Sequence, residues 1–273
     1  MIGIKNYESA LEVNKFPDGT FRINVDITIF NNNNSFEINW FYEKEEEMVI
    51  LFYLVSHIRN VKSNPIIVLN LPYTPNARMD RAENEDNVFT LKYFCNFINS
   101  LNFNKVYIVD PHSNVSEALL DRVVIARGAE RIKQNIDKIN NVLNDDSKQL
   151  VDMLFFPDEG AMKRYSKNCG TPFAFGIKRR DWATGEILNY EVNGDIPEGS
   201  NVLIVDDISS YGTTFYYAAK KLKEEYSAAN VYLFVTHCEN NILRGKLAET
   251  NYVDHVFTTK SIFTEKSDFV TII

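Results

Sequence analysis

Short apolar segments alternate along this chain with longer segments of helical periodicity. The apolar segments lie at 65–73, 105–113, 152–160, 201–207 and 230–237. Nearly continuous apolar runs of this length are typical of parallel strands buried in a sheet. Helical periodicity characterises the segments between them, at 43–60, 87–100 and 213–225. This alternation predicts an α/β fold with mainly parallel sheets.

A further helical segment, 131–150, indicates where the chain divides into domains. Its apolar residues recur at helical spacing before the segment ends in Asn, Asp and Ser; they are Ile132, Ile136, Ile139 and Leu143. A polar end to a helix is typical of a domain boundary. We therefore predict a boundary near residue 145, with an N-terminal domain at 1–145 and a C-terminal domain at 146–273.

The early part of the chain has a different pattern. Polar and apolar residues alternate along 21–30 and 36–42, on either side of a run of asparagines. Alternation at every second position is typical of a strand with one exposed face. We expect a hairpin or an edge region here.

The composition disfavours some classes of binding partner. The net charge of −8, from 29 Lys and Arg against 37 Asp and Glu, disfavours binding to a nucleic-acid backbone. Cys95, Cys169 and Cys238 are too few and too scattered for a disulfide framework, which favours a reducing, cytoplasmic setting. The longest uncharged apolar run, 48–58, is shorter than a membrane span, and the first residues lack a signal-peptide pattern. We expect neither a nucleic-acid nor a membrane partner.

Polar residues stand where the predicted strands end. These ends read Asp110-Pro111-His112-Ser113, Pro157-Asp158-Glu159-Gly160 and Asp206-Asp207. In open parallel sheets, ligands bind beyond the carboxyl ends of the strands. The sequence therefore predicts binding sites at these ends.

The segment 202-VLIVDDISSYGTTFYYAAKKLKEE-225 combines two binding features. Its loop places hydroxyls and backbone amides just before a helix N-terminus, which favours an anion; the loop residues are Ser209, Ser210, Gly212, Thr213 and Thr214. Asp206 and Asp207 offer oxygens that accept hydrogen bonds from two neighbouring hydroxyls. A phosphate-binding loop beside a pair of diol-binding carboxylates fits a ribose 5-phosphate group. An acidic strand end followed by a helix cap is the alternative interpretation.

This segment resembles the PRPP-binding motif shared by type I phosphoribosyltransferases and ribose-phosphate diphosphokinases, also called PRPP synthetases. Other segments resemble the diphosphokinases and occur in that family's order: 16-FPDGT-20, 72-PYTPNARMDR-81, 109-VDPHS-113, 157-PDEGAMKR-164 and 173-FAFGIKRR-180. The resemblance covers nearly the whole chain. It implies two Rossmann-like, phosphoribosyltransferase-type domains, each a mainly parallel sheet flanked by helices. The N-terminal domain would face ATP, and the C-terminal domain would carry the ribose-phosphate loop.

The resemblance also implies roles for single residues. The catalytic group would comprise Lys178, Arg180 and His112. Mg²⁺ would be held by His112 and Asp158. The ATP-binding set would be Phe16, Asp18, Arg78, Asp80 and His112. The ribose-phosphate set would be Asp206, Asp207, Ser209, Ser210, Tyr211, Gly212, Thr213 and Thr214. Since the segment around Phe16 reaches a neighbouring subunit in this family, we expect a homodimer or a larger homo-oligomer.

The implied reaction transfers the β,γ-diphosphate of ATP to the C1 hydroxyl of a ribose 5-phosphate group and releases AMP. The loop departs from the family pattern, because Ser210 replaces an Asp and Tyr211 replaces a Thr, and Thr20 stands where a Glu is usual. An aromatic ring here favours a wider pocket and a larger acceptor such as ADP-ribose. A type I phosphoribosyltransferase and a non-catalytic subunit associated with PRPP synthetase remain open as alternatives.

Overall fold

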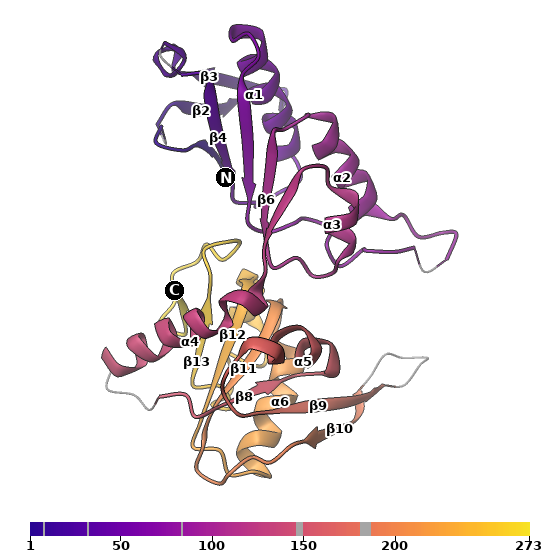
Figure 1. Cartoon of the computed structure of the whole chain (residues 1–273), viewed down its shortest axis with the longest axis vertical. Helices are drawn as coiled ribbons and strands as arrows, with labels where there is room; N and C mark the ends of the chain where they lie inside the picture. The colour runs from indigo at the N-terminus through magenta and orange to yellow at the C-terminus, as the bar shows by residue number, and fades with distance from the viewer. Residues whose placement is uncertain (8, 32, 83, 146–149, 181–186) are drawn as a thin grey trace. The chain divides into compact units, whose positions relative to one another are not determined.

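The computed structural model describes residues 1–273 except 8, 32, 83, 146–149 and 181–186. The chain separates into two compact units, Met1–Ala126 and Arg127–Ile273 (Figure 1). Each unit has its own sheet, in which most neighbouring strands run parallel. The predicted α/β fold with mainly parallel sheets is therefore confirmed.

The first unit is built on a sheet with the strand order β1-β4-β5-β6-β7. Strand β1 pairs antiparallel with β4, and the other neighbours pair in parallel. Its elements are β1 Ile2–Ile4, β2 Leu11–Lys15, β3 Phe21–Val25, η1 Ile27–Phe30, β4 Ser35–Trp40, α1 Glu47–Val61, β5 Ile66–Leu71, α2 Thr90–Ser100, β6 Lys105–Val109, α3 Val115–Leu119 and β7 Val123–Ala126.

The core of the first unit lies on one face of this sheet. Alternate positions along β5, Ile67, Leu69 and Leu71, are fully buried, while the intervening positions are half-buried or exposed. The buried positions share one core with the apolar sides of α1 and α2. Side chains alternate between the faces of a strand, so the helices bury only every second residue. The carboxyl ends of β5 and β6 consequently lie side by side at one edge.

The expectation of a hairpin or an edge region at 21–42 is met in part, because β3 forms a hairpin, but with β2 and not with 36–42. Strand β3 pairs antiparallel with β2, in a separate two-stranded sheet whose register runs from Leu11↔Val25 to Lys15↔Phe21. A tight turn at Phe16–Thr20 reverses the chain, with Gly19 at φ 86°. After β3, Asp26 caps the short helix η1, and β4 then enters the main sheet. The alternating pattern identified strands but not their partners.

The second unit contains a sheet of strand order β10-β9-β8-β11-β12-β13-β14, in which only the β9–β10 pair is antiparallel. Its elements are α4 Gly128–Asp145, β8 Met153–Phe156, α5 Glu159–Tyr165, η2 Ser166–Asn168, β9 Phe173–Arg180, β10 Ile187–Asn193, β11 Asn201–Ser209, α6 Thr213–Glu224, β12 Asn230–Cys238, η3 Asn240–Arg244, β13 His255–Thr258 and β14 Val270–Ile272.

Helices cover both faces of this second sheet. On one face, Leu154 and Phe156 of β8 pack in a core with apolar residues of α4 and α5. On the other, Met153 and Phe155 pack with apolar residues of α6. The helix α4 contributes Ile132, Ile136, Ile139 and Leu143 to the first of these cores. The compact units accordingly divide at Ala126/Arg127, ahead of the boundary near residue 145 that the sequence predicts.

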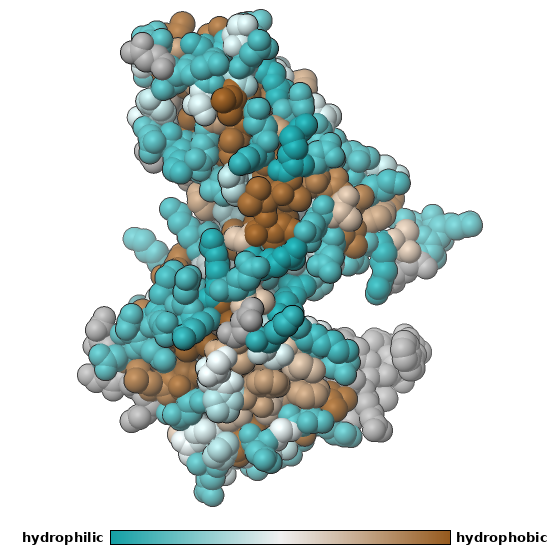
Figure 2. All heavy atoms as spheres, viewed as in Figure 1, coloured by the Kyte–Doolittle hydropathy of each residue, from teal (hydrophilic) through white to brown (hydrophobic). Residues whose placement is uncertain are grey.

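The surface of both units is mixed. Figure 2 shows hydrophilic residues over much of the visible face, interrupted by smaller hydrophobic areas. Within the described residues, no helix has both the length and the apolar character that crossing a bilayer requires.

Candidate functional site

Two adjacent carboxyl groups, those of Asp206 and Asp207, lie near the carboxyl end of β11. Asp207 is 5% exposed, and its carboxylate pairs with Arg164 of α5 at 3.4 Å. The backbone N–H of Asp207 donates to Oδ1 of Asp206 at 2.9 Å. The two side chains also share a hydrogen bond, so the carboxyl groups of these successive residues lie in contact.

The two carboxyl groups differ in their electrostatic surroundings. Burial, followed by repulsion from the Asp207 carboxylate, raises the pKa of Asp206 well above its ordinary value. A charge that is removed from water and placed beside a like charge holds its proton more tightly. Arg164 compensates the charge of Asp207 through their ion pair. The pair thus combines a carboxyl group whose pKa is raised with a carboxylate that a cation stabilises.

Asp158 lies at the end of the neighbouring strand β8. Its Oδ1 accepts a hydrogen bond from the Ala161 backbone N–H at 2.9 Å, so it caps the N-terminus of α5. Its negative charge also contributes to the raised pKa of Asp206. Strands β8 and β11 pair in parallel, which explains why their acidic ends meet.

The loop after β11 leads directly into the N-terminus of α6. Gly212 has a φ of 75°, a left-handed conformation that disfavours residues with a Cβ, and no side chain caps the helix. Thr213 is exposed and Thr214 is half-buried, while Ser209 at the strand end is buried. The first-turn amides of a helix lack partners within the helix, and the helix dipole favours an anion there. This loop has the features of an anion site.

Tyr211 is the large residue of this loop, and 53% of it is exposed. Its backbone is packed closely against Gly245, where an added Cβ would stand 2.0 Å from the Tyr211 carbonyl oxygen. The next residue, Gly212, lies against the Leu247 side chain. The segment 245–247 thus packs against the backbone of the loop, while the Tyr211 ring stays accessible to solvent.

In the first unit, the structure brings together the loops that follow β5 and β6. The Val109 backbone N–H donates to the Pro72 carbonyl at 3.0 Å, and Asp110, at φ 41°, is buried. Arg78 is exposed and Asp80 is half-buried in the first loop, and His112 is exposed in the second. All three side chains follow the carboxyl ends of neighbouring parallel strands.

Phe16 and Asp18 lie at the tip of the β2–β3 hairpin. Phe16 is 48% exposed, and Asp18 accepts hydrogen bonds from the backbone N–H and the hydroxyl of Thr20 at 2.9 and 2.7 Å. These bonds lower the pKa of Asp18, with the Thr20 hydroxyl as the largest cause. Asp18 therefore keeps its charge while it stabilises the turn.

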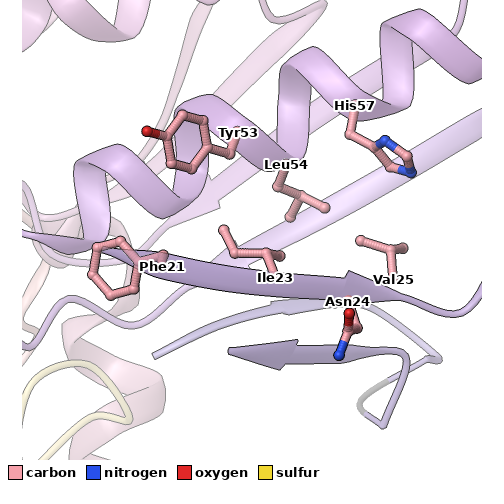
Figure 3. Close-up of a pocket in the computed structure, with 7 residues that line it drawn as sticks. All are labelled: Phe21, Ile23, Asn24, Val25, Tyr53, Leu54 and His57. Carbon is pink, nitrogen blue, oxygen red and sulfur yellow. The ribbon is translucent and has the colours of Figure 1, made fainter. Parts of the chain in front are cut away.

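A cavity of ≈ 440 Å³ separates this hairpin from α1. Tyr53, Leu54 and His57 of α1 face residues of β3 across it (Figure 3); the strand contributes Phe21, Ile23, Asn24 and Val25. His57 also contacts the edge of the Phe30 ring.

Lys178 and Arg180 belong to β9, but their side chains lie outside the described residues. The predicted magnesium residues occur in different units, His112 in the first and Asp158 in the second. Across the described residues, no group of three or more His, Cys, Asp or Glu is arranged to hold a metal. Mg²⁺ binds through one or two carboxylates, water and substrate phosphates, so Asp158 suits it without a protein cluster.

Sequence reasoning missed two residues of the second unit. Arg164 pairs with Asp207. It lies in the segment 157–164, which resembles the diphosphokinases, but the resemblance gave it no role. Tyr190 is buried, and the charges of Asp158 and Asp206 contribute to its raised pKa after burial. Nothing in the local sequence around Tyr190 indicates this position, because it depends on strand pairing.

Curated ribose-phosphate pyrophosphokinases are similar to the chain. One from Sulfolobus acidocaldarius is 26% identical and matches 92% of this chain and 84% of its own length. One from Pyrococcus abyssi is 26% identical, with 94% and 86% covered. The crystal structure of phosphoribosylpyrophosphate synthetase from Mycobacterium smegmatis superposes with a TM-score of 0.75 at 20% identity, covering 97% of this chain and 85% of that chain. No protein-family model matches the chain.

The architecture and these likenesses define a diphosphotransferase enzyme built from phosphoribosyltransferase-type domains. The acidic end of β11 and the loop before α6 stand where the resemblance in sequence predicts the ribose-phosphate motif. Over most of its length the chain resembles ribose-phosphate diphosphokinases. The predicted resemblance, fold class and enzyme class are thereby confirmed.

Proposed function

We propose that the protein transfers the β,γ-diphosphate of ATP to the C1 hydroxyl of a ribose 5-phosphate group and releases AMP. The observation that carries this proposal is the carboxyl pair of Asp206 and Asp207, followed at once by the loop before α6. The names of the curated relatives support the reaction class. In this proposal the first unit binds ATP and the second binds the ribose phosphate.

The carboxyl pair suits a vicinal diol. Each sugar hydroxyl both donates and accepts hydrogen bonds. Asp206 and Asp207 lie side by side at the strand end and would accept hydrogen bonds from two neighbouring hydroxyls. The 5-phosphate then binds the amides of Thr213 and Thr214 and their hydroxyls at the start of α6. Arg164 keeps Asp207 charged and fixes its direction.

The reaction needs no covalent intermediate on the protein. The C1 oxygen forms a bond to the β-phosphorus, the bond from that phosphorus to the α-β bridging oxygen breaks, and AMP leaves with that oxygen. The hydroxyl proton passes to water. Such transfers depend on positioning and on neutralisation of charge. Lys178 and Arg180 supply positive charge to the triphosphate. Arg78 and Asp80 bind ATP within the same chain. Phe16 and Asp18 contact the adenine of ATP bound to a neighbouring subunit.

A magnesium ion is part of the proposal. When bound, Mg²⁺ neutralises phosphate oxygens and holds them in a fixed geometry. Asp158, whose Oδ1 caps α5, would hold the ion or its water through its carboxylate. His112, exposed after β6, is the other residue that the resemblance assigns to magnesium. Because the hairpin tip completes a neighbour's site, the active assembly is a homodimer or larger.

The direct test is AMP formation from ATP with purified protein, Mg²⁺ and ribose 5-phosphate, with the 1-diphosphate product identified by mass spectrometry. The proposal expects equal amounts of AMP and diphosphorylated sugar, and a loss of both when EDTA is added. Ribosylation of a nucleobase from PRPP without AMP formation would instead support a phosphoribosyltransferase. Absence of both reactions with every ribose phosphate would support a non-catalytic subunit.

The exposed ring of Tyr211 favours a second candidate acceptor. At 53% exposure it borders the phosphate loop on an open side, where a substituted phosphate such as that of ADP-ribose could extend. A stacked base or sugar adds favourable contact with an aromatic ring. We therefore propose ADP-ribose as the alternative acceptor, with ADP-ribose 1-diphosphate as its product.

Parallel assays with ribose 5-phosphate and ADP-ribose separate the two acceptors. Tyr211→Thr should reduce kcat/KM for ADP-ribose by about fivefold and leave ribose 5-phosphate within about twofold, since one stacked aromatic contact contributes roughly 1 kcal/mol. Tyr217→Thr, an exposed tyrosine on α6, serves as the matched control. A wild-type preference for ribose 5-phosphate would reject the larger acceptor.

A further inference from the structure

The hydroxyl of Tyr190 links two strands that are not neighbours in the sheet. Tyr190 belongs to β10, and its hydroxyl donates to the Pro157 carbonyl, just beyond the end of β8, at 3.0 Å. Strand β9 lies between them in the order β10-β9-β8. The Tyr190 side chain is 8% exposed and contacts the Phe155 ring at 6.4 Å between centroids. The side chain therefore crosses over β9 inside the protein.

Gly176 provides the space for this crossing. A Cβ added to Gly176 would stand 2.2 Å from the Tyr190 hydroxyl oxygen and 2.8 Å from the Pro157 carbonyl oxygen. Real Cβ atoms essentially never come within 3.0 Å of such atoms. The bridge and a side chain at this position of β9 therefore exclude one another.

Both ends of the bridge adjoin groups of the proposed reaction. Pro157 immediately precedes Asp158, and Tyr190 pairs in backbone register with Lys178 of β9. Two residues beyond Lys178, Arg180 pairs with Ile187 in the same antiparallel arm. The bridge thus connects the β9–β10 arm to the strand end that carries Asp158.

We propose that Tyr190 is a positioning residue, which holds the arm bearing Lys178 and Arg180 in fixed register with the strand end at Asp158. This role rests on the proposed diphosphoryl transfer. Burial and the negative charges of Asp158 and Asp206 raise the pKa of Tyr190, so its hydroxyl remains a donor. Positioning of charged groups to within fractions of an ångström decides rates of such transfers.

The kinetic test is Tyr190→Phe, which keeps the ring and removes only the hydroxyl. We expect kcat to fall by about fivefold with the acceptor KM within about twofold, because one buried hydrogen bond contributes roughly 1 kcal/mol and the arm acts on the transition state. Tyr232→Phe is the matched control. Tyr232 is also buried, but it lies near the N-terminal end of β12, close to Asp254. Its kcat should match the wild type within about twofold.

Hydrogen exchange of the full-length protein provides a readout that is independent of catalysis. Tyr190→Phe should accelerate exchange of backbone amides in 173–180 and 187–193 at least about fivefold, while Tyr232→Phe leaves these peptides unchanged. An unchanged kcat in Tyr190→Phe, or a kcat loss equal to that of Tyr232→Phe, would overturn the proposal. Unchanged exchange would overturn the bridge itself.

The two proposals fail in different ways. If the wild-type protein transfers no diphosphoryl group to any ribose phosphate, the proposed function is wrong. The proposed positioning role of Tyr190 is then wrong as well. If the wild type is active and Tyr190→Phe retains full kcat, only the role of Tyr190 is wrong.

Discussion

Gly245→Ala tests the proposed phosphate-binding role of the loop before α6 from a position outside the predicted site. An added Cβ would stand 2.0 Å from the Tyr211 carbonyl oxygen, whereas real Cβ atoms keep at least 3.0 Å from such atoms. The loop backbone must therefore move by about 1 Å. A displacement of this size in a group that positions substrate costs about a hundredfold in rate. We expect kcat/KM for the ribose-phosphate acceptor to fall by about that factor.

The assay is the initial rate of AMP formation with the acceptor varied at saturating ATP. Because Gly245 lies in the second unit, KM for ATP should stay within about twofold if ATP binds the first unit. Overpacking should lower the free energy of unfolding by about 1–3 kcal/mol, which thermal unfolding measures. Gly3→Ala is the control, because its added Cβ meets nothing within 4 Å. An acceptor kcat/KM equal to wild type in Gly245→Ala would refute the reasoning.

Three further outcomes are expected. Asp206→Asn should abolish transfer yet raise Tm at neutral pH. Folding raises the pKa of Asp206. The stability that this carboxyl group contributes is therefore present below the ordinary carboxyl pKa of about 4 and is lost as the pH rises through the pKa of the folded protein. A Tm difference from wild type that does not grow with pH across that window, in calorimetry, would contradict this. Burial raises the pKa of the Cys95 and Cys238 thiols to about 12, so mass spectrometry should find both unmodified after iodoacetamide treatment of the native protein; rapid labelling would show that they open to solvent. Lys178→Ala and Arg180→Ala should each reduce AMP formation by about a hundredfold or more with unchanged Tm, and retained activity would remove that residue from the reaction.

The sequence predicted the strand ends of both units and the apolar strands and helices that lead to them. Asp206 and Asp207 follow an apolar strand and precede a helix, and each of these local features is readable in the chain. The pairing of β3 was mispredicted, because alternation identifies an exposed face without naming the neighbouring strand. The helix α4 was assigned to the first domain, because its periodicity shows an apolar side but not the sheet that it covers.

The sequence by itself determined the α/β class, the acidic strand ends and the loop before α6, because these follow from local periodicity and residue type. Only the tertiary structure revealed the residues that act across strands. Arg164 reaches Asp207 from a helix on one face of the sheet, and Tyr190 reaches Pro157 over Gly176. Such contacts join residues far apart in the chain, and their distances depend on register and packing. Local sequence patterns carry no information about either.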